Sequence, residues 1–184
     1  MSSDREQDRE MLARAATLRA PLARAARLAA SNGTGYVVFG ALTALFSLST
    51  ELSDLVALAV GATLVFVGIT ARRLAPRLRD GDADAARGLA RNELVLLAAI
   101  AVYCLLMLTV VSPVSDEIGD MLSSGGYAVD ITSMSRTVYA LILTIAVLYQ
   151  GGLSRYFFSK AALAEAYVAK VPEWARHAVA ALPS

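Results

Sequence analysis

The sequence predicts an all-α integral membrane protein with four transmembrane helices arranged as two hairpins, flanked by cytoplasmic amphipathic helices. Hydrophobic residues make up 57% of the 184 positions, and the mean hydropathy is +0.54. The charged residues lie in blocks, separated by apolar stretches of 17 or 18 residues. A soluble domain of this size carries far less apolar side chain, and about 17 residues is the lower limit for a spanning helix.

The four apolar stretches are residues 33–50, 55–71, 94–111 and 137–153, and none contains a charged side chain. Only residues 51–54 separate the first two stretches. Because so short a connection forces consecutive helices to run antiparallel as neighbours, we expect a helical hairpin there. The four stretches define a transmembrane bundle over 33–153, preceded by segment 1–32 and followed by segment 154–184.

Small residues recur along the first two spans at spacings that permit close helix contact. Gly40 precedes Ala44 by four residues, and Ala57, Gly61 and Gly68 follow steps of four and seven. Such spacings are typical of helix-packing interfaces. Glycine and alanine are also simply common in spanning helices, and both interpretations stay open.

The basic residues predict the orientation. Sixteen of the seventeen lie in segments 1–32, 72–93 and 154–184, whereas the connections 51–54 and 112–136 contain six acidic residues and only Arg136. Since basic residues are retained on the cytoplasmic side, both termini are expected there. The bias of fifteen arginines to two lysines and the absence of a cleavable signal peptide favour a prokaryotic inner membrane.

Segment 1–32 is expected to form a basic amphipathic helix. Its apolar face is mostly alanine, while four arginines that are candidate lipid or partner contacts occupy much of the remainder: Arg14, Arg19, Arg24 and Arg27. This helix is expected either to lie on the anionic leaflet or to dock on another protein helix. The run Ser-Asn-Gly-Thr-Gly at 31–35 predicts a hinge before the first span.

The other two basic segments also carry helix signals. Pro76 discourages continuation of the second span, and the alternating aspartates at 80–84 resemble a calcium loop but lack its glycine and glutamate at the required places. A turn followed by an aspartate N-cap for the next helix is the preferred interpretation. After the fourth span, Pro172 is expected to restart a short helix that carries Trp174 at the headgroup level.

The outside loop 112–136 is acidic, and a short helix over 115–121 and a weak strand over 127–132 are expected in it. The acidic residues of this loop and of the first hairpin tip are candidates for attracting cations: Glu51, Asp54, Asp116, Glu117 and Asp120. Exclusion of basic residues from outside loops explains the same composition without a function. Thr43, Ser47 and Thr50 form a polar stripe on the first span, suited either to a pore or to a packing seam.

Catalytic, metal and cofactor sites are not predicted. Cys104 and His177 are single residues of their type, which removes disulfide frameworks and clustered metal ligands. None of the four spans contains a carboxylate, an arginine or a histidine, the usual signs of a proton path or an intramembrane protease. Of the polar side chains in the spans, Gln150 is the most costly to place in the membrane. The polar pair Asn92 and Glu93 directly precedes the third span.

The sequence therefore favours a non-enzymatic, oligomer-forming integral membrane protein that acts as a scaffold or accessory subunit. Its expected partners are membrane lipids, other copies of itself and a protein bound by the cytoplasmic helices, with no nucleic acid. The rival hypothesis is a homo-oligomeric cation channel with an acidic outer vestibule and the first span lining the axis.

Overall fold

The computed structural model describes residues 2–49, 55–110 and 131–181. These residues form five helices, which are α1 (Ser2–Ser49), α2 (Leu55–Arg79), α3 (Ala83–Val110), α5 (Ile131–Lys170) and α6 (Glu173–Ala180). Four of them, all except α6, are long and apolar enough to cross a membrane. The described part of the chain is thus all-helical, with lengths and compositions that indicate membrane insertion. The short helix expected over 115–121 lies outside the described residues, as does the strand expected over 127–132 except for Ile131 and Thr132. These two residues begin helix α5, so the strand is wrong there.

Helix α1 is continuous over 48 residues. The expected hinge at 31–35 is wrong, because the helix passes through this run without a break. One tertiary contact and one local hydrogen bond favour the continuity: Gly33 packs directly against α2, and the Thr34 hydroxyl donates to the Ala30 carbonyl at 3.0 Å. The glycine serves close helix approach here rather than flexibility.

The connection between α2 and α3 is a tight turn. Helix α2 continues past Pro76 to Arg79, so proline does not end the helix where it was expected to. Gly81 then adopts φ +91°, a left-handed conformation that glycine tolerates best. The Asp82 carboxylate accepts the backbone N–H groups of Asp84 at 2.8 Å and Ala85 at 3.1 Å, which confirms the aspartate N-cap.

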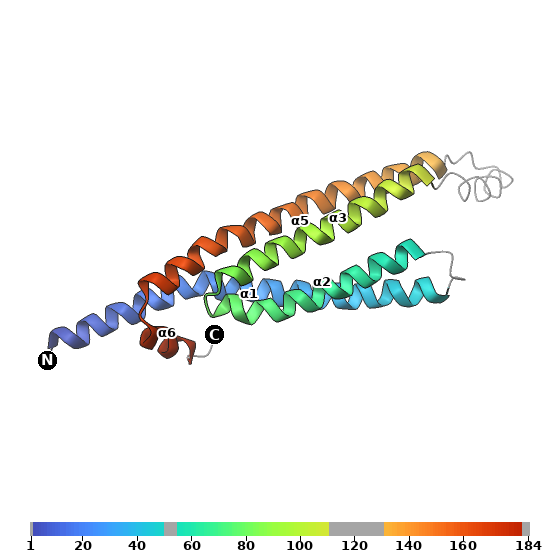
Figure 1. Cartoon of the computed structure of the whole chain (residues 1–184). Coiled ribbons are helices and arrows are strands. Elements are labelled where there is room, and N and C mark those ends of the chain that lie inside the picture. Colours follow the sequence, from blue (N-terminus) through green and yellow to red (C-terminus); the bar gives the residue numbers. More distant parts are fainter. Residues whose placement is uncertain (1, 50–54, 111–130, 182–184) are drawn as a thin grey trace.

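Helix α5 contains the apolar stretch 137–153, continues well beyond it and ends at Lys170. Pro172 occupies the N-cap position of α6, with φ −62° and ψ 152°. The short C-terminal helix begins directly after the proline, as the sequence predicts. Figure 1 shows α6 near the N-terminal part of α1, at the same end of the molecule as both termini.

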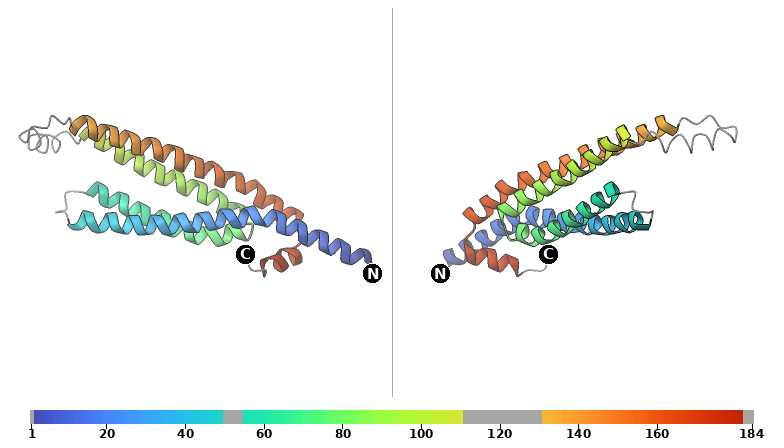
Figure 2. Two further views of the ribbon diagram at one scale, coloured as in Figure 1. Left: turned by 180° about the vertical axis from the view of Figure 1, so that it is seen from behind. Right: turned by 45° about the vertical axis from the view of Figure 1, so that its right-hand side comes forward.

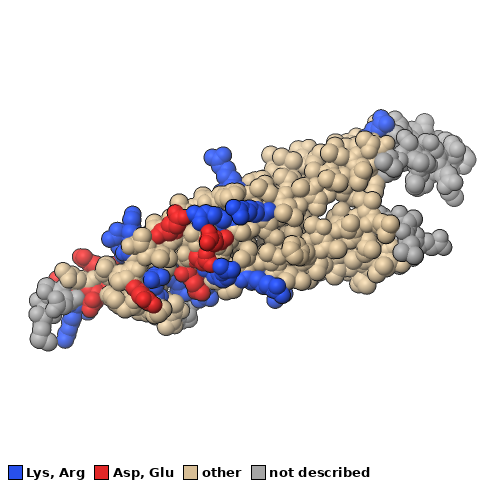
Figure 3. Space-filling model, in the orientation of Figure 1, with Lys and Arg blue, Asp and Glu red and all other residues tan. Residues whose placement is uncertain are grey.

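The long helices pack as two pairs, α1 along α2 and α3 along α5. Figures 1 and 2 show the pairs close together at the end that carries the termini and increasingly separated toward the opposite end. Figure 3 shows a hollow between them there, and it shows most of the charged side chains gathered on the other half of the molecule, with one basic side chain at the far end. We call residues 5–32, 72–93 and 154–181 the basic end, and residues 33–49, 55–71, 94–110 and 131–153 the apolar end.

Four glycines, which we call the glycine seam, allow α1 and α2 to touch. A Cβ added at Gly40 would lie 2.6 Å from the Gly61 carbonyl oxygen, and one added at Gly68 would lie 2.5 Å from that of Gly33. Gly33 and Gly40 are seven residues apart, as are Gly61 and Gly68, so each pair repeats on one helix face. Of the two interpretations left open above, close packing applies to Gly40, Gly61 and Gly68.

The side chains of the two ends differ in burial. All five helices contribute to one alanine-rich core at the basic end, which includes Leu22, Leu78, Leu89, Phe157 and Tyr167. The apolar end instead exposes large hydrophobic side chains such as Phe39 (68% exposed), Phe46 (71%) and Leu148 (71%). Exposed apolar surface of this extent is typical of lipid contact or of a protein interface.

Candidate functional site at the basic end

A buried polar cluster lies where the apolar and basic ends meet. The Tyr36 hydroxyl on α1 lies 3.0 Å from Glu93 Oε2 on α3 and 3.2 Å from Gln150 Oε1 on α5. Glu93 is 1% exposed and Gln150 is 5% exposed. Burial of a carboxyl group is costly unless it is hydrogen-bonded or protonated, so this cluster is the most demanding polar site near the spans.

Proton positions in this cluster are constrained because a tyrosine hydroxyl has one hydrogen. The hydroxyl can donate to only one of its two neighbours, and the other must then donate to the Tyr36 oxygen. Either Glu93 is protonated, or Gln150 turns its amide nitrogen toward the tyrosine. Both arrangements join three helices through one hydroxyl.

Further polar contacts at the same level include the fourth long helix. Asn92 Nδ2 donates to the Val67 carbonyl of α2 at 2.9 Å. The Tyr149 hydroxyl lies 3.5 Å from Asn32 Oδ1, a long contact, and Asn32 Nδ2 is buried with no partner among the described residues. The cluster thus ties α1, α2, α3 and α5 together at one level. Sequence reasoning noted Asn92 with Glu93 as a pair and Gln150 by itself, but it did not connect them and missed Tyr36.

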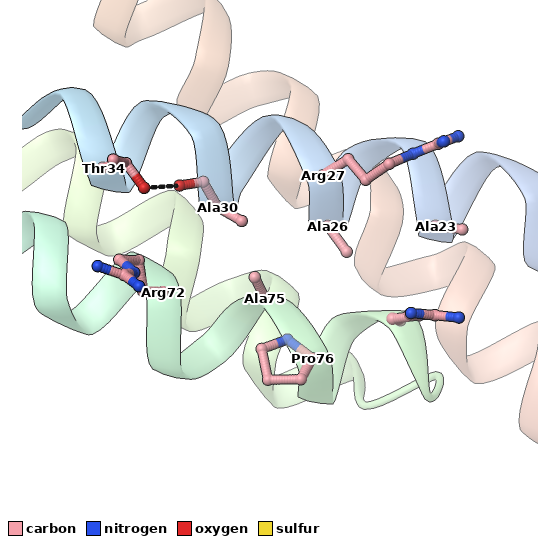
Figure 4. Close-up of a pocket in the computed structure, with 9 residues that line it drawn as sticks. Ala23, Ala26, Arg27, Ala30, Thr34, Arg72, Ala75 and Pro76 are labelled. Carbon is pink, nitrogen blue, oxygen red and sulfur yellow. Dashed lines mark hydrogen bonds between the residues drawn. The ribbon is translucent and has the colours of Figure 1, made fainter. Parts of the chain in front are cut away.

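A groove runs between α1 and α2 at the basic end, with a volume of about 410 Å³. We call it the basic groove, and its lining residues are Ala23, Ala26, Arg27, Ala30, Thr34, Arg72, Ala75, Pro76 and Arg79. Figure 4 shows Ala26, Ala30 and Ala75 between the two helices. Three arginines beside an apolar floor suit a ligand that combines an anionic group with an apolar portion.

The four arginines singled out in segment 1–32 have different environments. Arg14, Arg24 and Arg27 are exposed, and Arg27 also lines the basic groove. Arg19 is 7% exposed and donates from Nη1 to the Val179 carbonyl of α6 at 2.6 Å. The alanine-rich face of the same helix is buried in the core of its own chain. This face therefore contacts helices of its own chain, while the expected contacts with the leaflet or with a partner protein stay predictions.

Trp174, the remaining candidate contact, lies on α6 and is 47% exposed. Helix α6 packs on α1 near Arg19, fourteen residues before the first apolar stretch. At 1.5 Å per residue, that is about 21 Å along the helix axis. Trp174 thus lies on a helix that packs well before the first apolar stretch. Its expected position at the headgroup level stays a prediction.

Most residues of the predicted cation pathway lie outside the described residues: Thr50, Glu51, Asp54, Asp116, Glu117 and Asp120. The hydroxyl groups of Thr43 and Ser47 donate to the carbonyls of Phe39 and Thr43, each at 2.9 Å. Ser47 is 8% exposed and lies on the same helix face as Gly40, which contacts α2. This environment is typical of a packing seam.

Groups that could carry chemistry are dispersed. Within the described residues, no three His, Cys, Asp or Glu side chains come together to hold a metal ion. Cys104 is buried in α3, and His177 is exposed on α6. No protein-family model, curated protein or solved structure matches the chain.

Proposed function

We propose that this chain is a non-enzymatic, self-associating integral membrane protein, a scaffold or accessory subunit whose basic end lies in the cytoplasm and binds anionic lipid of the inner leaflet. The observation that carries the proposal is the basic groove, whose arginines surround an apolar floor. The four long apolar helices support membrane insertion. The concentration of basic residues in three segments supports a cytoplasmic location for this end.

The position of the groove suits a lipid headgroup. Thr34 lies at the start of the first apolar stretch and Arg72 directly follows the second, so the groove begins where the apolar surface ends. A phosphate group there meets the guanidinium groups while an adjoining acyl chain covers the alanine floor. Each basic residue near an anionic surface contributes about 1 kcal/mol to binding.

Self-association is supported by the apolar end. The pairs α1–α2 and α3–α5 diverge there, and large side chains such as Phe46 and Leu148 are exposed. A second copy of the chain would cover part of this surface. Native mass spectrometry in nanodiscs should therefore give a mass of two or more copies, and a strict monomer would contradict this part of the proposal.

The lipid-binding test uses point variants rather than removal of the N-terminal helix, because residues such as Leu22 belong to the core. Protein in nanodiscs of phosphatidylcholine with a minor share of phosphatidylglycerol is released for mass spectrometry, and the retained anionic lipids are counted. Arg27→Gln with Arg72→Gln should lower phosphatidylglycerol retention about thirtyfold, from about 1 kcal/mol at each site. Arg24→Gln with Arg73→Gln is the charge-matched control, since these arginines are exposed on α1 and α2 but do not line the groove.

Equal retention by the double variant and the control would refute lipid binding in the groove. The cation-channel alternative has its own measurement. Ion flux through liposomes that contain the purified protein is expected to match that of empty liposomes, whereas cation-selective flux lowered by Glu51→Gln would replace the scaffold proposal with the channel.

A further inference from the structure

A second cavity lies at the basic end, between α1, the end of α2, α5 and α6. We call it the α6 pocket; its volume is about 320 Å³, and its lining residues are Arg19, Arg79, Asp80, Tyr167, Arg176, His177 and Ala180. Arg79 is shared with the basic groove. The lining combines four separate helical segments, so the pocket exists only when α6 is docked.

The charge of the α6 pocket is strongly positive. Three guanidinium groups, those of Arg19, Arg79 and Arg176, face one carboxylate, that of Asp80. The ion pairs found among the described residues involve only Arg77 and Arg87 as cations. The three pocket arginines are therefore not neutralised by any described carboxylate within ion-pair distance.

The wall of the pocket also contains an unpaired hydrogen-bond donor. Arg176 lines the pocket, and its Nε lies behind the pocket surface, with almost no solvent-accessible area and no partner among the described residues. A buried donor left unpaired is costly, and such groups are rare in native proteins. Arg19, which also lines the pocket, is 7% exposed and donates from Nη1 to the Val179 carbonyl, so this hydrogen bond accounts for one of its five N–H donors.

The walls of the pocket are held by close packing. A Cβ added at Gly81 would lie 2.7 Å from the Tyr167 ring, so the turn after α2 is pressed directly beneath that ring. Tyr167 is 2% exposed. This contact fixes Asp80 and Arg79, the residues just before the turn, relative to α5. The backbone that carries Arg79 and Asp80 is thus held against α5 independently of α6.

We propose that the α6 pocket binds the phosphate group of a phosphate monoester and thereby holds α6 against α1 and the end of α2. Guanidinium groups recognise phosphate through paired, charge-assisted hydrogen bonds. The volume would hold about ten waters, which leaves room for part of the esterified molecule beside the phosphate. This inference does not rest on the proposed function, because Arg176 and Asp80 belong to the α6 pocket and not to the basic groove.

The single tryptophan of the chain gives a direct readout, because Trp174 lies on α6. The full-length protein in nanodiscs of phosphatidylcholine alone is titrated with glycerol 3-phosphate, with sodium chloride at matched ionic strength as the control. A saturable change in Trp174 fluorescence is expected with the phosphate monoester only. A second set of nanodiscs contains phosphatidic acid, which tests whether a lipid can supply the same group.

Two variants of opposite expected sign make the test specific. Arg176→Gln should weaken glycerol 3-phosphate binding about ten- to a hundredfold, the range expected for loss of a hydrogen bond to a charged group. Asp80→Asn should strengthen binding, because it removes the carboxylate that opposes the anion; Asp80 is exposed, so its replacement leaves the core intact. Arg155→Gln, on an exposed residue of α5 that does not line the pocket, is the control and should bind as the unaltered protein does.

A fluorescence change in neutral nanodiscs that follows this order of affinities supports a soluble phosphate ester as the ligand. The same order seen only with phosphatidic acid supports the site and assigns the phosphate to a lipid. No saturable change with either probe, or equal weakening by Arg176→Gln and Arg155→Gln, overturns the proposal. Arg176→Gln could also alter the fluorescence in the absence of ligand by displacing α6. In that case Arg176→Lys, which keeps the positive charge, should bind more tightly than Arg176→Gln, and Asp80→Asn should still bind more tightly than the unaltered protein; failure of both overturns the proposal.

Discussion

Adding one methyl group at Gly40 should force α1 and α2 apart. The new Cβ would lie 2.6 Å from the Gly61 carbonyl oxygen and 2.8 Å from the backbone nitrogen of Val65, and neither backbone atom can rotate away. Ordinary contact begins at 3.4 Å, so the helices must separate by about 0.8 Å at this point. Overpacking of this kind costs about 1–3 kcal/mol, against which alanine recovers about 0.5–1 kcal/mol of helix propensity.

The net loss for Gly40→Ala is therefore up to about 2.5 kcal/mol, which corresponds to a fall in Tm of up to about 10 °C for a chain of this size. Thermal unfolding in detergent micelles, followed by circular dichroism, measures it. Gly151→Ala on α5 is the matched control, because nothing lies within 4 Å of the added Cβ. It should raise Tm by about 1–4 °C through helix propensity alone.

The variant Gly40→Ala/Gly61→Ala adds a stricter requirement. Both methyl groups demand the same separation of the helices, so their combined cost should be smaller than the sum of the single costs. If Gly40→Ala instead raises Tm as much as Gly151→Ala does, the two helices are not in contact at the glycine seam and the reasoning fails.

Three further outcomes are expected. Tyr36→Phe should destabilise the protein by about 1–3 kcal/mol because it leaves the Glu93 carboxyl buried without this hydrogen bond, whereas Tyr149→Phe removes only a 3.5 Å contact and should cost less in the same melt. Asp82→Ala should cost about 1 kcal/mol at neutral pH through loss of the cap. Burial by itself would raise the pKa of Asp82, but backbone N–H groups and Arg77 lower it overall, so the difference from the unaltered protein should begin to shrink as pH falls below about 3.9 and should vanish only below the lowered pKa of the folded state. Gly81→Ala should lower Tm by more than Gly40→Ala, since the residue has φ +91° and lies beneath a ring, and an unchanged Tm would show that the turn is not constrained.

Much of the helical pattern is readable from the sequence because hydrophobicity acts locally. The four long apolar helices, the Asp82 cap and the restart at Pro172 each follow from residues close together in the chain. The hinge expected at 31–35 failed for a nonlocal reason. Gly33 contacts Gly68 on another helix, and that contact, invisible to local propensity, stabilises helix through a sequence that otherwise favours a turn.

The sites were harder to predict because their members are far apart in sequence. Tyr36 is 57 residues from Glu93 and 114 from Gln150, and only helix packing brings them together. Arg19 differs from Arg14 and Arg24 only by the angle at which it leaves α1, yet it alone of the three is buried against α6. The basic composition of the segment predicts anion binding, whereas the division between surface and pocket arginines depends on tertiary contacts.

Helix α1 runs without a break through the basic end and the apolar end. Its 48 residues extend over about 72 Å. The glycine seam lies in the second half of the helix, and the contact of Arg19 with α6 lies in the first half. Spanning helices accommodate a change in bilayer thickness by tilting, and a tilt of about 5° about one end would displace the other by about 6 Å. In the proposed membrane location, the unbroken α1 would thus couple the tilt of its apolar part to the packing around α6.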